Sequence, residues 1–168
     1  HDPRKFGRLY WVDDPAEIVG HLGPEPLAKR FTGKRLAEML AVRRRQLKPL
    51  LLDQRFIAGL GNIYVDEALW TSGLHPETPS HTVGPTGAHR LHRAIRRVLR
   101  GGLGNGGTSL SNGEGNFSSV NGHAGRNRDH LAVFRRTGQP CLRCGTAIER
   151  IIVGQRGTHF CPRCQRPE

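Results

Sequence analysis

The chain has 168 residues, and its 26 lysines and arginines exceed its 14 acidic residues to give a formal charge of +12. A charge excess of this size favours a polyanionic partner, with nucleic acid first and an acidic membrane surface second. The sequence has no apolar run long enough to cross a bilayer and no amphipathic anchor, which argues against the membrane alternative. The length suits one domain, or a helical domain with a small metal-stabilised module.

Residues 6–12, near the start of the chain, have the apolar and aromatic content of a β-strand. A strand needs neighbouring strands to be stable. We therefore expect this stretch to pair with residues outside the 168, as a segment of a longer protein.

Capping residues and apolar spacing predict that the next part of the chain is helical. Asp14 and Pro15 start a short helix that ends near Gly23, and a second helix starts at residue 32. Further helices are expected over residues 48–58, 63–73 and 85–100. Residues 43–45 are arginines after the second helix, where a solvated helix end is the simpler interpretation and phosphate contact the alternative.

A turn containing two glycines, residues 59–62, separates two of these helices. Glycines let a partner approach the backbone, and the following helix presents unpaired N–H groups at its positive end, so the layout suits an anion site. A helical hairpin in which Asn62 is a plain N-cap explains the same residues without a ligand. The two interpretations stay open at this point.

Glycine, serine and asparagine dominate residues 101–130, which predicts a long loop that is either functional or disordered. Residues 131–134 are apolar and are expected to form a short strand that leads into the C-terminal part of the chain.

All the cysteines of the chain lie in two Cys-x-x-Cys pairs near the C-terminus, Cys141 with Cys144 and Cys161 with Cys164. The gap between the pairs, residues 145–160, has the length of a structural zinc site, in which a short hairpin brings the second pair round to complete a tetrahedron. Four thiolates leave no open coordination position, so this zinc ion is expected to hold structure.

Two disulfides are the alternative for these cysteines, but they need an oxidising compartment, and the sequence has nothing like a secretory signal. The intervening residues predict a β-hairpin. Its first strand is the β-branched stretch 148–153, its turn is 154–157, and its second strand is 158–160. His159 is expected to be an ordinary hairpin residue and not a ligand.

Three motifs resemble the formamidopyrimidine-DNA glycosylase family: residues 48–54 with 59–67, residues 140–165, and residues 2–7. The resemblance implies a mostly α fold, a helix–two-turns–helix bundle with a C-terminal four-cysteine zinc β-hairpin, preceded by a strand remnant of a β-sandwich domain. The expected parts are the end of that sandwich domain over 1–13, a DNA-binding domain over 14–100, a glycine-rich flexible loop over 101–130 and a zinc finger over 131–168.

The resemblance also implies roles for individual residues. Arg4 and Phe6 match the wedge that fills the gap left when a damaged base is flipped out of the duplex. The residues that match phosphate-binding positions are Lys48, Gly61, Asn62 and Arg156. The catalytic proline and adjacent glutamate of the family are expected upstream, so this segment alone is predicted to be inactive.

The function implied is base-excision repair, by a bifunctional DNA glycosylase and AP lyase that removes oxidised purines such as 8-oxoguanine and formamidopyrimidines. The expected partner is double-stranded damaged DNA, the cofactor one structural zinc ion, and the protein a monomer in the bacterial cytoplasm, associated with the nucleoid. The first alternative is a non-catalytic DNA-binding zinc protein of the same fold. The second is an RNA-binding zinc-ribbon module.

Overall fold

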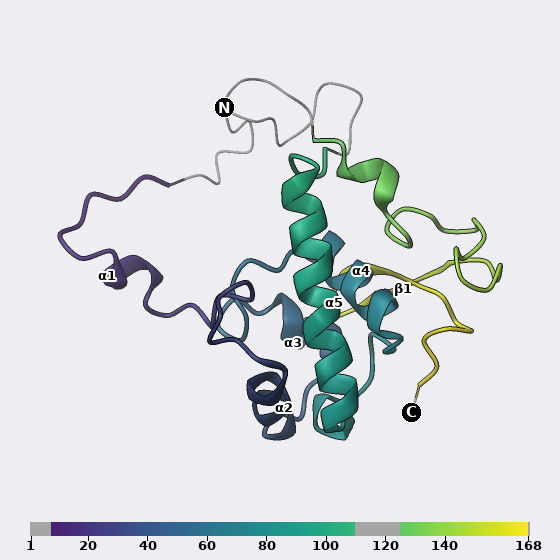
Figure 1. Cartoon of the computed structure of the whole chain (residues 1–168), viewed down its shortest axis with the longest axis horizontal. Coiled ribbons are helices and arrows are strands. Elements are labelled where there is room, and N and C mark those ends of the chain that lie inside the picture. Colours follow the sequence, from purple (N-terminus) through teal and green to yellow (C-terminus); the bar gives the residue numbers. More distant parts are fainter. Residues whose placement is uncertain (1–7, 110–124, 168) are drawn as a thin grey trace.

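The computed structural model describes residues 8–109 and 125–167, and over these residues the chain is mostly helical (Figure 1). The wedge residues proposed from the sequence, Arg4 and Phe6, lie outside the described residues. The α-helices are α1 Ala16–Val19, α2 Gly33–Ala41, α3 Leu47–Leu52, α4 Asn62–Ser72 and α5 Pro85–Gly104. The 3-10 helices η1 and η2 cover Ser80–Thr82 and Asn127–His130, and the strands are β1 Glu149–Val153 and β2 Arg156–Phe160.

The main core lies where α5 packs against α2 and α4, and α3 packs against α4. Each helix contributes apolar residues at helical spacing, which is the pattern that predicted them. Helix α2 begins as expected, because the Thr32 side chain accepts a hydrogen bond from the amide of Arg35 at 3.2 Å. The innermost side chains are Phe31, Leu36, Leu40, Leu47, Leu50, Leu51, Ile57, Leu60, Leu69, Leu91 and Ile95.

The strand expected over residues 6–12 is wrong for its described part, since residues 8–12 have no regular secondary structure. Leu9 and Trp11 are almost fully exposed, at 101% and 98%. Among the described residues no strand lies beside this stretch, and backbone groups without a partner strand stay bonded to water. Helix α1 is also shorter than predicted, although the carboxylate of Asp14 accepts from the amide of Ala16 as a capping residue would.

The prediction that the third helix runs to residue 58 is wrong, because α3 ends at Leu52. Asp53 is extended, with ψ at 110°. The backbone that follows bonds to residues 23 and 24: the amide of Gly23 donates to the Gln54 carbonyl, and the amide of Ala58 donates to the Pro24 carbonyl. These long-range bonds replace the i→i−4 ladder that would have continued the helix.

Helix α4 covers Asn62–Ser72 with Gly73 as its C-cap, close to the predicted limits. Gly73 has φ of 74°, the left-handed conformation that commonly ends a helix and that glycine adopts without strain. Helix α5 runs four residues past the predicted end at Arg100, and Gly102 lies under the ring of Tyr64. A side chain at 102 would overlap that ring, so glycine permits this close helix crossing.

Strands β1 and β2 form an antiparallel hairpin, in register from Glu149 opposite Phe160 to Val153 opposite Arg156. Its two turn residues, Gly154 and Gln155, have φ of 55° and 61°, as a type I′ turn requires. The predicted hairpin is therefore confirmed, with a tighter turn than the four residues expected.

Candidate functional site

The sulfur atoms of the four cysteines lie within 4.8 Å of one another. Individual sulfur–sulfur distances are 4.0 Å for Cys141 to Cys164, and 3.5 Å for Cys144 to both Cys161 and Cys164. A tetrahedral Zn²⁺ with bonds of about 2.3 Å places its sulfurs about 3.8 Å apart. A disulfide needs about 2.05 Å, so the alternative of two disulfides is wrong.

Hydrogen bonds orient the sulfurs around the centre of this cluster. The amide of Arg143 donates to the Cys141 sulfur at 3.5 Å, and the amide of Cys164 donates to the Cys161 sulfur at 3.4 Å. The indole N–H of Trp70 in α4 also donates to the Cys141 sulfur, at 3.4 Å. Donors outside the ligand set fix ligand geometry in metal sites, and here one of them comes from the helical bundle.

The thiols of the cluster have divergent pKa values. Hydrogen bonds from Thr146 lower the pKa of Cys144 to about 6, whereas burial and the neighbouring thiols raise the pKa of Cys164 to about 12. Adjacent thiolates repel one another, so full ionisation of the set needs a cation at its centre. The residues present therefore fit a divalent, thiolate-preferring metal. Within the described residues the cluster contains only the cysteines, and His159 is not part of it.

Arg143 joins the cysteine cluster to the helical bundle. Its guanidinium donates to the carbonyls of Trp70 and Thr71 at 2.7 and 2.9 Å, and it stacks over the Trp70 ring at 3.9 Å. These carbonyls belong to the last turn of α4, where the helix dipole favours a cation. The metal end of the hairpin is thus held at the C-terminal end of α4.

Asp66, in the middle of α4, joins the same helix to β2. Its carboxylate is fully buried and accepts from Lys48 Nζ at 2.6 Å, from the His159 amide at 2.9 Å and from His159 Nδ1 at 3.2 Å. Burial lowers the pKa of Lys48, and the charge of Asp66 opposes that shift. A buried charge needs partners of this kind, so this group fixes how β2 lies on α4.

The carbonyl of Gly157 in β2 is the meeting point of the phosphate-binding residues proposed from the sequence. It accepts from Lys48 Nζ at 2.9 Å and from Asn62 Nδ2 at 3.1 Å. Arg156 is the preceding residue, and its charge is close enough to contribute to the lowered pKa of Lys48. Gly61 is the N-cap of α4. The structure therefore gathers all four residues at the N-terminal end of α4.

Two features of this four-residue cluster differ from the simplest interpretation of the sequence. Asn62 is not a plain N-cap, because it is the first residue of α4 and its side chain bonds to the hairpin. Its Oδ1 atom is buried without a partner among the described residues. Lys48 has no exposed side-chain surface, so in this conformation its charge lies behind the Gly157 carbonyl.

Sequence reasoning missed the buried carboxylates Asp66 and Glu67. Glu67 accepts at 2.9 Å from three consecutive amides, those of residues 132–134. These bonds explain why the strand predicted there is wrong, since the amides that a strand would pair point at one carboxylate. Burial raises the pKa of Glu67, and the three amides oppose the shift. The available signal was two adjacent acids inside an otherwise apolar helix.

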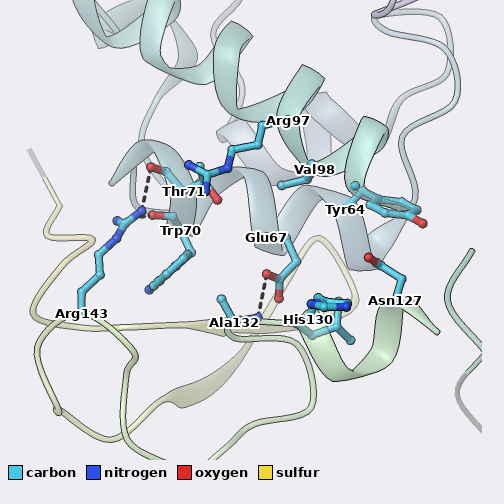
Figure 2. Close-up of a pocket in the computed structure, with 12 residues that line it drawn as sticks. Tyr64, Glu67, Trp70, Thr71, Arg97, Val98, Asn127, His130, Ala132 and Arg143 are labelled. Carbon is cyan, nitrogen blue, oxygen red and sulfur yellow. Dashed lines mark hydrogen bonds between the residues drawn. The ribbon is translucent and has the colours of Figure 1, made fainter. Parts of the chain in front are cut away.

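A cavity of about 370 Å³ opens beside Glu67, between α4, α5 and residues 127–132 (Figure 2). Arg97 of α5 lies over it, and Arg143 lies on the other side of Trp70. Its walls combine two aromatic residues of α4, Tyr64 and Trp70, with Glu67 and two arginines, so it is not a purely apolar ligand pocket.

Two family models match this chain. The model described as the formamidopyrimidine-DNA glycosylase H2TH domain matches residues 22–113, and the zinc finger found in FPG and IleRS matches residues 138–167. The second match, together with the four gathered sulfurs, confirms the predicted zinc site.

Curated relatives and solved structures agree with these matches. The chain is 50% identical over 166 residues to a formamidopyrimidine-DNA glycosylase of Protochlamydia amoebophila, covering 99% of this chain and 60% of that protein. A protein of the same name from Roseiflexus is 48% identical, with coverage of 98% and 60%. The chain thus spans about three fifths of the length of these relatives.

The crystal structure of the MutM (Fpg) protein from Thermus thermophilus matches with a TM-score of 0.92 at 44% identity, covering all of this chain and 64% of that one. A Lactococcus lactis Fpg mutant in complex with DNA containing Fapy-dG matches with a TM-score of 0.82 at 39% identity, covering 90% and 54%. No helix among the described residues is long and apolar enough to cross a membrane.

Proposed function

Because this chain belongs to the formamidopyrimidine-DNA glycosylase family, we propose that it is the DNA-binding part of a bifunctional glycosylase and AP lyase. Its substrate is double-stranded DNA that carries oxidised purines. The lesion is flipped out of the duplex while this part of the protein holds the flanking backbone.

The observation that carries the proposal is the cluster at the N-terminal end of α4. A helix of 11 residues points its unpaired amides outward at Gly61 and Asn62, and the hairpin brings Arg156 to the same place. Helix N-termini bind phosphate through those amides, and arginine adds a charge-assisted, bidentate contact. Two parts of the chain that are distant in sequence thus present donors to one anion.

We assign the direct phosphate contacts to Gly61, Asn62 and Arg156. Lys48 adds a positive charge behind them and holds the Gly157 carbonyl, which keeps Arg156 in place. When a phosphate arrives, the Asn62 amide group exchanges its bond to Gly157 for a bond to the phosphate. This exchange leaves Gly157 still bonded to Lys48, so the hairpin stays anchored.

The chemistry of the whole protein follows the family resemblance. A proline secondary amine, expected outside these 168 residues, attacks C1′ of the flipped nucleotide, and the base leaves with the electrons of the broken glycosidic bond. The resulting Schiff base then undergoes β- and δ-elimination. Arg4 and Phe6 fill the vacated space in the duplex. The contribution of this chain is positioning, which is a necessary part of such catalysis.

A gel-shift with the zinc-loaded chain on a duplex containing one abasic site, paired with borohydride trapping, tests the proposal. We expect salt-dependent binding without a covalent adduct. Asn62→Ala and Arg156→Ala should each lower affinity. Arg156→Ala should also reduce the slope of log K against log salt by about 1, whereas Asn62→Ala removes no charge and should leave the slope unchanged. Arg163→Ala, an exposed arginine of the same zinc module, is the matched control and should leave both unchanged.

Three outcomes would contradict parts of this proposal. A trapped adduct would place a reactive amine inside the chain. Tighter binding to intact RNA than to abasic DNA would favour the zinc-ribbon alternative. Equal losses in Arg163→Ala and Arg156→Ala would mean that the hairpin arginine acts only through general charge.

A further inference from the structure

Helix α5 carries a row of arginines that the proposed phosphate site does not use. Four of them follow the spacing i, i+3, i+7 and i+10, which places them on one face of a helix. We call this row the α5 ridge, and it consists of Arg90, Arg93, Arg97 and Arg100.

The α5 ridge has no acidic counterpart. Pro85–Gly104 contains no aspartate or glutamate, whereas solvated helix faces usually interleave both signs. All four arginines are exposed, and within residues 8–109 and 125–167 none of them makes an ion pair or a hydrogen bond. Arginine neighbours three and four residues apart repel one another, so the row is unfavourable for the isolated helix.

Arg96, on the same helix, has a structural role and serves as a comparison for the ridge arginines. Its guanidinium donates to the carbonyls of Pro26 and Ala28 at 2.8 and 3.1 Å, and it is half-buried. It therefore ties α5 to the segment before α2. The ridge arginines have no such task among the described residues.

Helix α4 separates the α5 ridge from the phosphate site. It packs against α5 and also against β2, so among the main packing contacts of the described helices and strands the hairpin reaches α5 only through this helix. In Figure 1, α5 crosses in front of α3 and α4, with the hairpin behind. The four ridge arginines are exposed and are not among the residues assigned to the first duplex.

We propose that the α5 ridge binds the phosphate backbone of a second DNA duplex while the first is held at the N-terminal end of α4. The ridge is about 15 Å long, with a guanidinium about every 5 Å. The exposed large apolar residue of α5, Leu103, lies beyond its C-terminal end and not between its charges. Protein partners need apolar anchors at the centre of an interface, whereas a phosphate backbone needs only regularly spaced cations. The inference rests on the proposed function only for the first duplex.

Two differently labelled duplexes, one with an abasic site and one intact, test the bridging by energy transfer between them. The ridge variant replaces all four ridge arginines by alanine, which favours the helix and preserves folding. The control variant removes the same charge from four other exposed arginines, Arg43, Arg44, Arg163 and Arg166. We expect energy transfer with the wild type and the control, and at least a roughly tenfold loss with the ridge variant.

Binding of intact duplex in an Asn62→Ala/Arg156→Ala background separates this inference from the proposed function. Residual binding there should persist, and adding the ridge substitutions should flatten its salt slope by about 3 to 4, since each phosphate contributes about 0.9. The inference is wrong if the wild type never bridges, if ridge and control variants lose bridging equally, or if the ridge variant loses the abasic duplex as well. Stronger competition by polyglutamate than by intact DNA would assign the ridge to an acidic protein.

Discussion

The two ends of the zinc hairpin are attached to opposite ends of the same helix, α4, by different chemistry. The metal end has four sulfurs, and Arg143 and Trp70 fasten it to the last turn of the helix. The turn end has no metal, and a buried ion pair and two hydrogen bonds to the Gly157 carbonyl hold it at the first turn.

The metal end therefore sets the shape of the hairpin, whereas the turn end carries the groups that we propose bind phosphate. Metal–thiolate bonds set the geometry of the hairpin independently of its surroundings, as expected for a small module with little core of its own. In the proposed function, hydrogen bonds at the turn end exchange, and that end then offers its donors to a phosphate. The ion pair of Lys48 with Asp66 fixes the position of the turn without using those donors.

Removing the metal should have the largest effect on this arrangement. A strong chelator should abolish abasic-duplex binding, because structural zinc contributes about 10–16 kcal/mol to folding in small zinc modules. The main core contains no cysteine, so far-ultraviolet circular dichroism should keep most of its helical signal. The change in tryptophan fluorescence on metal removal should come from Trp70 at the metal end, because the other tryptophan, Trp11, is already almost fully exposed. Full binding by the metal-free chain would show that the turn end positions itself alone.

Breaking the buried pair should have the next largest effect. Lys48→Met leaves the Asp66 carboxylate buried without its cation and should cost about 3–5 kcal/mol in urea unfolding. In Lys48→Met/Asp66→Asn the charge is gone, and the asparagine oxygen still accepts from the His159 amide, so at least about 1 kcal/mol should return.

The exposed pair of Arg45 and Asp53 is the matched control for that experiment. Its oxygen–nitrogen distance of 2.8 Å is similar, but the side chains are 49% and 32% exposed. Asp53→Asn should therefore cost about 1 kcal/mol or less. Equal losses at the two pairs would mean that the buried pair does not anchor the hairpin.

Acidification should have the smallest effect on stability. It acts on His75, which contacts the hairpin between its metal end and its turn end. His75 is buried against the edge of Phe160 in β2, and its Nδ1 accepts from the Glu77 amide. Burial lowers the pKa of His75 below its ordinary 6.5. Its contribution to stability is therefore full above pH 6.5 and is lost as the pH falls, since the unfolded chain takes up the proton first.

His75→Asn keeps an acceptor for the Glu77 amide and does not titrate. The melting temperature of the wild type should fall more between about pH 7.5 and 5.5 than that of this variant, by about 2–4 °C for each kcal/mol lost. Proton competition for the zinc thiolates is common to both chains and cancels. Parallel pH profiles would contradict the assignment to His75.

Local signals in the sequence were sufficient for the helices that end in caps and for the hairpin. Thr32 and Gly73 act through neighbours only a few residues away, and the cysteine spacing encodes the metal site. The failures involve distant partners. Helix α3 stops because residues 54 and 58 bond to residues 23 and 24, and the strand at 131–134 is replaced by bonds to Glu67.

The candidate site likewise combines residues that the sequence predicted with a long-range contact that it did not predict. The family resemblance predicted phosphate-binding roles for Asn62 and Arg156, but it gave no reason for these two residues to lie close together. The reason is Asp66, which lies one helical turn beyond Asn62 and is bonded to β2. A buried carboxylate that binds residue 159 from residue 66 leaves no pattern in either segment alone.

The single hairpin that connects metal and turn also couples their equilibria. If zinc strengthens phosphate binding by ordering Arg156 and Gly157, then phosphate binding must strengthen zinc retention by the same factor, because the two free energies belong to one thermodynamic cycle. DNA would then protect the cysteines from chelators and oxidants while the protein is engaged. The metal would be lost most readily from molecules that are between binding events.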